Sequence, residues 1–549
     1  PQVLPSGTHG IEALYPPIKD VPPRTYSGLV RQAWEAGNLD LQDPLPQSLL
    51  AQFGMPSYAE ALYHAHFPET MDDLAQAVRR QSFEDLLLFR IAVRQLDRST
   101  GMGRALKANR TVVQPFLDEL PYQLTGAQDR VLREALADME SDRPMARLVE
   151  GDVGCGKTVI AFALLACAFE NGCQGAMMAP TEVLAQQHYN EAKRLLEPLG
   201  ARVVHLMGAV HGKERKETLA ALASGEADIV IGTHALITES VEYKNLGVII
   251  TDEQHRFGVR QRGMLAEKAE NPHLLVMSAT PIPRTLGLLI YGDLDVSVIG
   301  ELPPGRRSIE TYAVPSSYHE RIYAFLEKQL AEGRQAYIVC PMVEENGELP
   351  DERKAVTAYA EKLQKEVLPN RTVRFLHGKM KAKEKETVMR AFAAGEIDVL
   401  VSTTVVEVGV DVPNASVMLI ENAECFGLSQ LHQLRGRVGR GPWQSYCILV
   451  SDNRGEDNKT RLDAMRRTQS GFALAEEDLK LRGPGDFFGA RQHGLPTLRV
   501  ADFTCDMELL YEAQGAAEAL LALDPRLEGH PALHARVREL FDLNAEALN

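Results

Sequence analysis

A glycine-rich segment in the first half of the chain has the residue types and spacing of a phosphate-binding loop. The segment consists of Gly151, Asp152, Val153, Gly154, Cys155, Gly156, Lys157 and Thr158. Between a strand and a helix, such glycines let backbone N–H groups converge on phosphate oxygens at the positive helix end. Lys157 would pair with the terminal phosphates and Thr158 would coordinate Mg²⁺. A purely structural turn would not explain the adjacent lysine and threonine, so the segment predicts binding of ATP with Mg²⁺.

An acidic pair further along the chain could complete the hydrolytic chemistry. Asp252 and Glu253 follow an apolar, strand-like run, which places them at the carboxyl edge of a parallel sheet. Asp252 would hold the hydrated Mg²⁺, and Glu253 would orient and deprotonate the attacking water. A solvated turn is the alternative for a lone Asp-Glu pair. After a phosphate loop, the pair instead predicts ATP hydrolysis.

A third segment supplies arginines from the second half of the chain. Gln433, Arg437 and Arg440 belong to the run Gln-Leu-Arg-Gly-Arg-Val-Gly-Arg at 433–440. Two arginines three residues apart share one helical face and could reach the γ-phosphate, where they would stabilise the charge that develops during phosphoryl transfer. A surface basic patch is the alternative. The phosphate loop lies in the first half of the chain and this run in the second, and we expect the two halves to form separate lobes. Hydrolysis would then require closure of the lobes.

The elements that must position these residues form two related sets. Short β-branched runs alternate with helix-like stretches across 146–451, as in parallel sheets covered on both faces. The candidate strands are 147–150, 175–179, 228–233, 247–252 and 274–278 in the first set, and 336–341, 373–377, 398–403, 417–421 and 447–451 in the second. Five residues of the first set recur at one constant spacing in the second: Gly208, Gly225, Glu226, Asp228 and Thr233 match Gly378, Gly395, Glu396, Asp398 and Thr403. This repetition predicts two homologous α/β lobes with a cleft between them.

The flanking regions are helical in pattern. We expect a helical connector at 1–110, a first lobe at 111–303, a second lobe at 304–455, and a helical hairpin with a helical C-terminal region at 456–549. The net charge of −16 argues against a protein that coats nucleic acid through its overall charge, so any contact with nucleic acid should be local. No long apolar run or signal peptide is visible, which predicts a cytoplasmic protein without a membrane partner.

The ordered motifs across residues 115–500 resemble those of the superfamily-two helicases, whose fold is two tandem RecA-like lobes. The resemblance implies that Gln128 pairs with adenine and that Phe116 stacks on it. It further implies contacts with nucleic acid, or coupling of hydrolysis to movement, at hydroxyl residues that lie at predicted strand ends. These residues are Thr181, Thr233, Ser278, Thr280 and Thr403. A strand-end cap is the alternative for each hydroxyl.

Two further runs resemble the RecG family and the related transcription-repair coupling factors. They are Asp-Glu-Gln-His-Arg-Phe-Gly-Val at 252–259 and Leu-Arg-Gly-Pro-Gly-Asp-Phe-Phe-Gly at 481–489. Both families carry a helical hairpin after the last helicase motif, here expected at 461–502. The resemblance implies coupling roles for His255, Arg482 and Gln492. A helix pair that merely packs on the second lobe is the alternative.

The region ahead of the lobes resembles the RecG connector, which favours RecG over the coupling factors. The resemblance implies an ATP-driven, 3'-to-5' translocase on duplex DNA that remodels stalled replication forks and Holliday junctions. The resemblance further implies a nucleoid-associated monomer, with a single-stranded-DNA-binding protein as a candidate partner. The family's branch-binding wedge, an oligonucleotide-binding barrel, has no counterpart in this sequence. A coupling-type translocase, an RNA helicase of the same superfamily and a nucleotide-gated scaffold without hydrolysis stay open as alternatives.

Overall fold

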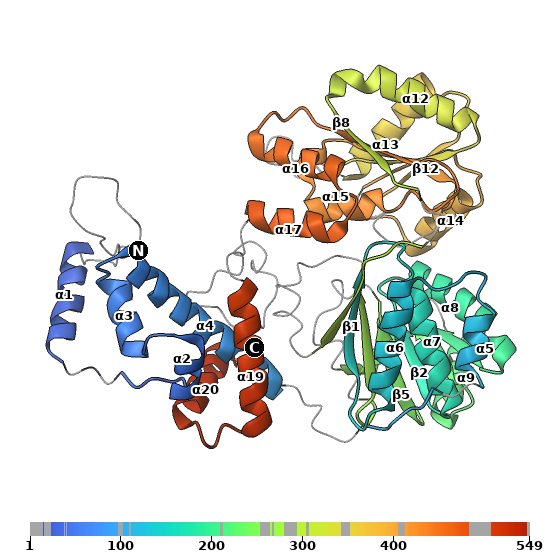
Figure 1. Ribbon diagram of the computed structural model, residues 1–549. Coiled ribbons are helices and arrows are strands. Elements are labelled where there is room, and N and C mark those ends of the chain that lie inside the picture. The colour runs from blue at the N-terminus through green and yellow to red at the C-terminus, as the bar shows by residue number, and fades with distance from the viewer. Residues whose placement is uncertain are drawn as a thin grey trace. The chain divides into compact units, whose positions relative to one another are not determined.

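The computed structural model separates the chain into two compact units (Figure 1). Unit 1 combines helices from before residue 98 and after residue 482, and unit 2 holds the part between them. The structure describes residues 15, 23–37, 39, 41–96, 103–108, 111–208, 212–252, 264–265, 268–278, 294–303, 307–341, 352–403, 412–482 and 507–545.

Unit 2 contains a first lobe built on a seven-stranded sheet in the order β3-β4-β2-β5-β6-β1-β7. Every strand pairing in it is parallel. The strands are β1 (Ala146–Gly151), β2 (Gln174–Met178), β3 (Val203–Leu206), β4 (Ile229–Gly232), β5 (Leu246–Thr251), β6 (His273–Ser278) and β7 (Asp295–Ile299). The central strands are almost wholly buried, which is why their sequences are continuously apolar.

Helices cover both faces of this sheet. One face packs against α5 (Val113–Asp118), α6 (Gly126–Glu140), α7 (Lys157–Glu170) and α8 (Glu182–Leu196). The other face packs against α9 (Gly212–Ser224) and the short turn η2 (His234–Ile237). Helix α7 is apolar around most of its circumference because it lies in the middle of its layer, beneath other helices.

The second lobe is a six-stranded parallel sheet in the order β10-β11-β9-β12-β13-β8. Its strands are β8 (Glu310–Val314), β9 (Gln335–Val339), β10 (Val373–Leu376), β11 (Val399–Ser402), β12 (Ala415–Ile420) and β13 (Tyr446–Val450). Its core is covered by α12 (His319–Ala331) and α13 (Glu352–Lys362) on one face, and by α14 (Ala382–Ala393), α15 (Leu428–Arg435), α16 (Glu456–Arg467) and α17 (Gly471–Arg482) on the other. The predicted fold of two tandem RecA-like lobes is confirmed.

Unit 1 is a helical bundle that draws on both ends of the chain. Its helices are α1 (Pro23–Glu35), α2 (Gln47–Phe53), α3 (Tyr58–His66), α4 (Met71–Leu96), α19 (Met507–Leu523) and α20 (Pro531–Ala545). The long α4 packs against α3, α19 and α20, and in Figure 1 the red C-terminal helices lie beside the blue α4. Arg79 of α4 donates to Glu512 of α19 at 2.8 Å, next to a shared apolar core.

The predicted C-terminal segment at 456–549 is divided between the two units. Helices α16 and α17 pack on the second lobe, whereas α19 and α20 join the N-terminal helices. Amphipathic patterns reveal that a helix has a face to bury, but they do not show which other face will cover it. Among the described helices, none combines the length and apolar character required to cross a bilayer.

Candidate active site

The phosphate loop lies between β1 and α7, as its sequence predicts. Gly154 and Gly156 take φ values of 77° and 84°, in the left-handed region that glycine adopts without strain. A Cβ atom on Gly156 would lie 2.2 Å from Nε2 of Gln128, so any side chain there would displace the amide of Gln128. Lys157, the first residue of α7, donates from Nζ to the carbonyl oxygens of Gly151 at 2.7 Å and Asp152 at 3.2 Å.

Gln128 braces this loop from the first turn of α6. Its Nε2 donates to the carbonyl oxygen of Cys155 at 2.8 Å, and its Oε1 accepts from the backbone N–H of Thr125 at 2.8 Å. Thr125 returns the contact by capping the helix, since its hydroxyl accepts from the Gln128 N–H. Gln128 is therefore buried between helix and loop. Its pairing with adenine stays a prediction.

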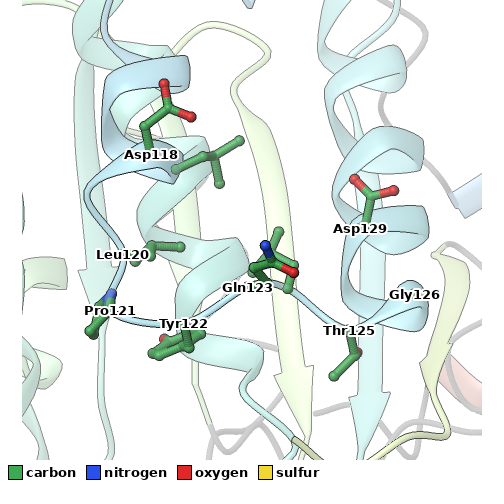
Figure 2. A pocket seen from close by; sticks show the side chains of 10 residues that line it. Asp118, Leu120, Pro121, Tyr122, Gln123, Thr125, Gly126 and Asp129 are labelled. Atoms are coloured by element: carbon green, nitrogen blue, oxygen red, sulfur yellow. The ribbon is translucent and has the colours of Figure 1, made fainter. Parts of the chain in front are cut away.

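The assignment of Phe116 as the adenine-stacking residue is wrong. Phe116 is only 1% exposed, because it packs in the core of the first lobe. Tyr122 is the aromatic residue that is available nearby, with 49% of its surface exposed. It borders an open pocket of about 690 Å³ along the segment that leads into α6. Figure 2 shows this segment with Tyr122, Gln123 and Thr125 in sequence, flanked by Asp118 of α5 and Asp129 of α6.

A second cavity, of about 270 Å³, brings together groups predicted from separate motifs. Lys157 and Thr158 of the phosphate loop line it together with Asp252, and the second lobe contributes Arg437 and Arg440. Arg437 is 5% exposed, so its charge is largely withdrawn from water. Gln433 is buried on α15 and is not among the residues that line this cavity.

A polar link that the sequence analysis missed joins the phosphate loop to the second lobe. Oδ1 of Asp152 lies 2.8 Å from Nε2 of His432 on α15, and its Oδ2 accepts from the backbone N–H of Gly471 at 3.1 Å. Arg435 donates to Nδ1 of His432 at 2.9 Å, so Nδ1 acts as the acceptor and Nε2 carries the proton toward Asp152. Arg435 is held in turn by the carbonyl oxygen of Met465 at 2.7 Å.

Charge and burial oppose each other in this link. Burial would raise the pKa of the Asp152 carboxyl, but the hydrogen bond from His432, the Gly471 N–H and the charge of Lys157 together lower it. Burial lowers the pKa of Arg435. Arg435 lies inside the arginine-rich run at 433–440 and His432 directly precedes it, but the sequence pattern indicated only Gln433, Arg437 and Arg440 as site residues.

Asp252 stands directly after β5, where its backbone N–H donates to the carbonyl oxygen of Met178 at 2.9 Å. Its Oδ2 lies 2.8 Å from Nε2 of His188 on α8, another residue that the sequence analysis did not single out. Glu253, His255, Thr280 and Gln492 lie outside the described residues, as does the side chain of Arg482.

The hydroxyls assigned to nucleic-acid contact lie at strand and helix ends. Thr181 is the N-cap of α8 and accepts from the Leu184 N–H. Ser278 ends β6, and Thr233 and Thr403 follow β4 and β11; these three residues are at most 2% exposed. Thr181 acts as a cap, whereas the buried hydroxyl of Thr233 has no hydrogen-bond partner among the described residues, and contact with DNA stays a prediction for all four.

Comparison with known proteins places this geometry in a family. Residues 125–288 match the DEAD/DEAH box helicase model, residues 319–442 the helicase conserved C-terminal domain, and residues 468–548 the model "ATP-dependent DNA helicase RecG, domain 3, C-terminal". The chain is 47% identical to the ATP-dependent DNA helicase RecG of Bacillus subtilis over 95% of this chain and 77% of that protein. It is 44% identical to the RecG of Synechocystis over 91% of this chain and 60% of that one.

A solved structure gives the same result. A RecG bound to a three-way DNA junction superposes with a TM-score of 0.72 at 40% identity, covering 87% of this chain and 62% of that one. The DNA-bound helicase MrfA, at 18% identity and a TM-score of 0.51, shares the fold. The chain belongs to the RecG family of ATP-dependent DNA helicases.

Proposed function

We propose that this chain hydrolyses ATP and uses the free energy to translocate along duplex DNA with 3'-to-5' polarity. On branched DNA, this movement would reverse stalled replication forks and migrate Holliday junctions. The observation that carries the proposal is the cavity in which Lys157, Thr158 and Asp252 of the first lobe face Arg437 and Arg440 of the second. The relative solved on a three-way junction supports branched DNA as the substrate class.

The residues of this cavity fit the Mg²⁺ ion that accompanies ATP. Mg²⁺ prefers oxygen ligands, and the Thr158 hydroxyl and the Asp252 carboxylate line the same cavity as the phosphate-pairing Lys157. Thr158 and Asp252 would hold the ion, which neutralises phosphate charge when it is bound. Glu253 would orient and deprotonate the attacking water.

The arginines would stabilise the charge that develops on the transferred phosphoryl group. They come from the second lobe, so any change in the spacing of the lobes changes their distance from the phosphate loop. The link from Asp152 to His432 and Gly471 connects that loop to α15 and to the start of α17. We infer that this connection couples hydrolysis to the DNA-contacting parts, with Arg482, the last residue of α17, and Gln492, which follows it in sequence, as coupling residues.

The ATPase rate in the presence of linear duplex, forked DNA and single-stranded RNA tests the proposal. A duplex-DNA translocase is stimulated by both DNA forms, and fork reversal follows ATP consumption. Stimulation by RNA alone would identify the RNA-helicase alternative. Binding of DNA and ATP without turnover would identify the nucleotide-gated scaffold. The same preparation, examined by light scattering with and without a single-stranded-DNA-binding protein, tests the expected monomer and the candidate partner.

A further inference from the structure

His188 and Asp252 form a buried pair at the edge of the nucleotide cavity. Nε2 of the imidazole lies 2.8 Å from Oδ2 of the carboxylate, and the side chains are 5% and 11% exposed. Both residues line the cavity that also holds Lys157 and Thr158. An ionised carboxylate only accepts hydrogen bonds, so Nε2 is the donor and one of the two oxygens of Asp252 is engaged by it.

The imidazole is held firmly in this position. It projects from α8, which is anchored to the sheet by the buried side chains of Leu184 and Leu196. The ring of Phe162, on the helix that starts at Lys157, meets it edge to face with centroids 6.4 Å apart and planes at 87°. Within the described part of the chain, Nδ1 is buried and has no hydrogen-bond partner. The bond to Asp252 is therefore the polar contact that orients this ring.

The second lobe contains a counterpart without a phosphate loop. Glu421 follows β12 as Asp252 follows β5, and its N–H donates to the carbonyl oxygen of Val339 at 2.9 Å, as that of Asp252 does to Met178. The hydroxyl of Tyr359, on the helix that follows β9, donates to Oε1 of Glu421 at 2.6 Å. Burial and the charge of Glu421 raise the pKa of Tyr359, so this hydroxyl stays protonated as a donor. In each lobe, the acid at this strand end thus accepts a hydrogen bond from the corresponding helix, α8 in the first lobe and α13 in the second.

We propose that His188 is a positioning residue for metal binding. By donating to Oδ2 of Asp252, it fixes the orientation of the carboxylate that would hold the Mg²⁺ accompanying ATP. Hydrogen bonds behind a metal-binding carboxylate set its orientation, and their loss typically costs about 10–100-fold in metal affinity or activity. The proposal rests on the proposed function in that it assumes Asp252 to be a metal ligand.

The test compares two variants of matched shape in the full chain. His188→Gln retains an N–H donor, whereas His188→Met removes it and keeps an unbranched side chain. The affinity for a fluorescent, non-hydrolysable ATP analogue is measured in EDTA and at increasing Mg²⁺ concentration. We expect both variants to match the natural chain in EDTA. We expect H188M to need about 10–100-fold more Mg²⁺ for the same gain in affinity, and H188Q to need less than H188M.

A histidine elsewhere in the same lobe provides the control. Nε2 of His205 lies 3.5 Å from Oε1 of Glu214 in the first lobe. The variant H205M should leave the Mg²⁺ requirement unchanged. An unchanged Mg²⁺ requirement in H188M would overturn the proposal, as would an equal loss of affinity in EDTA, which indicates a structural role. The readout needs no DNA and no turnover, so a failure of the proposed translocase function would be recognised separately, by the missing stimulation of the ATPase.

Discussion

The two lobes of unit 2 hold their second strands with the same side-chain device. In the first lobe, Gln174 at the start of β2 donates to the carbonyl oxygens of Leu222 and Ala227 at 2.9 and 2.8 Å. In the second, Gln335 at the start of β9 donates to those of Phe392 and Ile397 at 2.6 and 2.7 Å. Asp228 and Asp398 repeat a further contact, each accepting at 2.7 Å from the backbone N–H that precedes the neighbouring strand.

The lobes differ at the connection that follows their first strands. In the first lobe, β1 leads into the glycine-rich loop and Lys157. In the second, β8 leads into Pro315 and a short turn whose Ser316 N–H donates to Asp452 at 2.9 Å. The same sheet therefore does not bind phosphate by itself, because that ability depends on a loop whose N–H groups are free to converge. The second lobe instead contributes Arg437 and Arg440 to the cavity beside the first lobe's phosphate loop.

Replacing the two arginines of the second lobe should have the largest effect on ATP hydrolysis. Arg437→Ala and Arg440→Ala remove the second lobe's charges from the cavity, and arginines in this role contribute about 10³–10⁵-fold to kcat. The loss should appear in kcat, with nucleotide affinity in the absence of turnover changed far less. Arg466, an exposed arginine of α16, serves as the control. If R466A were equally damaging, the effect could not be assigned to the cavity.

Breaking the link between the lobes should have a smaller effect. Asp152→Asn keeps the shape but removes the charge that accepts from His432 and Gly471. Hydrogen bonds to charged groups contribute about 1.5–3 kcal/mol, so closure of the lobes should weaken by about 10–100-fold. Steady-state kinetics should show a lower kcat in the presence of duplex DNA. A normal kcat with only a raised KM would place Asp152 in nucleotide binding alone.

The paired glutamines allow the shared scaffold to be tested lobe by lobe. Gln174→Leu and Gln335→Leu each remove two buried hydrogen bonds, although the Leu222 and Phe392 carbonyls keep backbone donors, so the expected cost is about 1–3 kcal/mol in the free energy of unfolding. We expect similar destabilisation for both, measured by denaturant unfolding, with nucleotide binding retained. Destabilisation by only one variant would show that the braces are not equivalent.

The smallest expected effect is on the free energy of unfolding at acidic pH. Because the folded pKa of Asp152 is lowered, its stabilising contribution is fully present above the unfolded pKa of about 3.9 and is lost as the pH falls through the folded value. The stability difference between the natural chain and D152N should therefore be constant from about pH 5 to 7 and shrink below about pH 3.9.

Asp452, whose pKa is lowered by its hydrogen bonds to Ser316, should show the same sign in D452N. Its effect should be smaller because it is exposed. Unfolding at stepped pH values gives both differences, and a gap that widens in acid would contradict the assignment.

Much of the fold follows from the sequence because its central strands are apolar, short and bounded by turns. The strands that were missed, β3, β7 and β8, lie at or near sheet edges, where partly exposed residues interrupt the apolar run. The phosphate loop and the acidic and arginine motifs were found because their chemistry depends on residues adjacent in sequence.

The supporting residues of the site were harder to find. His188 and His432 act through partners far away in the chain, and a lone histidine in a helix carries no local signal. Phe116 was misassigned for a related reason, since an aromatic residue near a motif looks the same in sequence whether it is buried or exposed. Only the packing of α5 against α7 reveals that it belongs to the core.

Unit 1 is built from helices that lie on both sides of the two lobes in the sequence, which determines the order in which its parts are synthesised. Helix α4 precedes both lobes in the sequence, whereas the residues that cover its apolar face, among them Ala517 and Val537, follow both lobes. Each lobe is continuous in sequence and can fold as it leaves the ribosome. The apolar side chains of Phe83, Leu87 and Ile91 must meanwhile wait for α19 and α20. The bundle therefore cannot close until both lobes and the helices that follow them have been synthesised, and the apolar face of α4 stays uncovered until then.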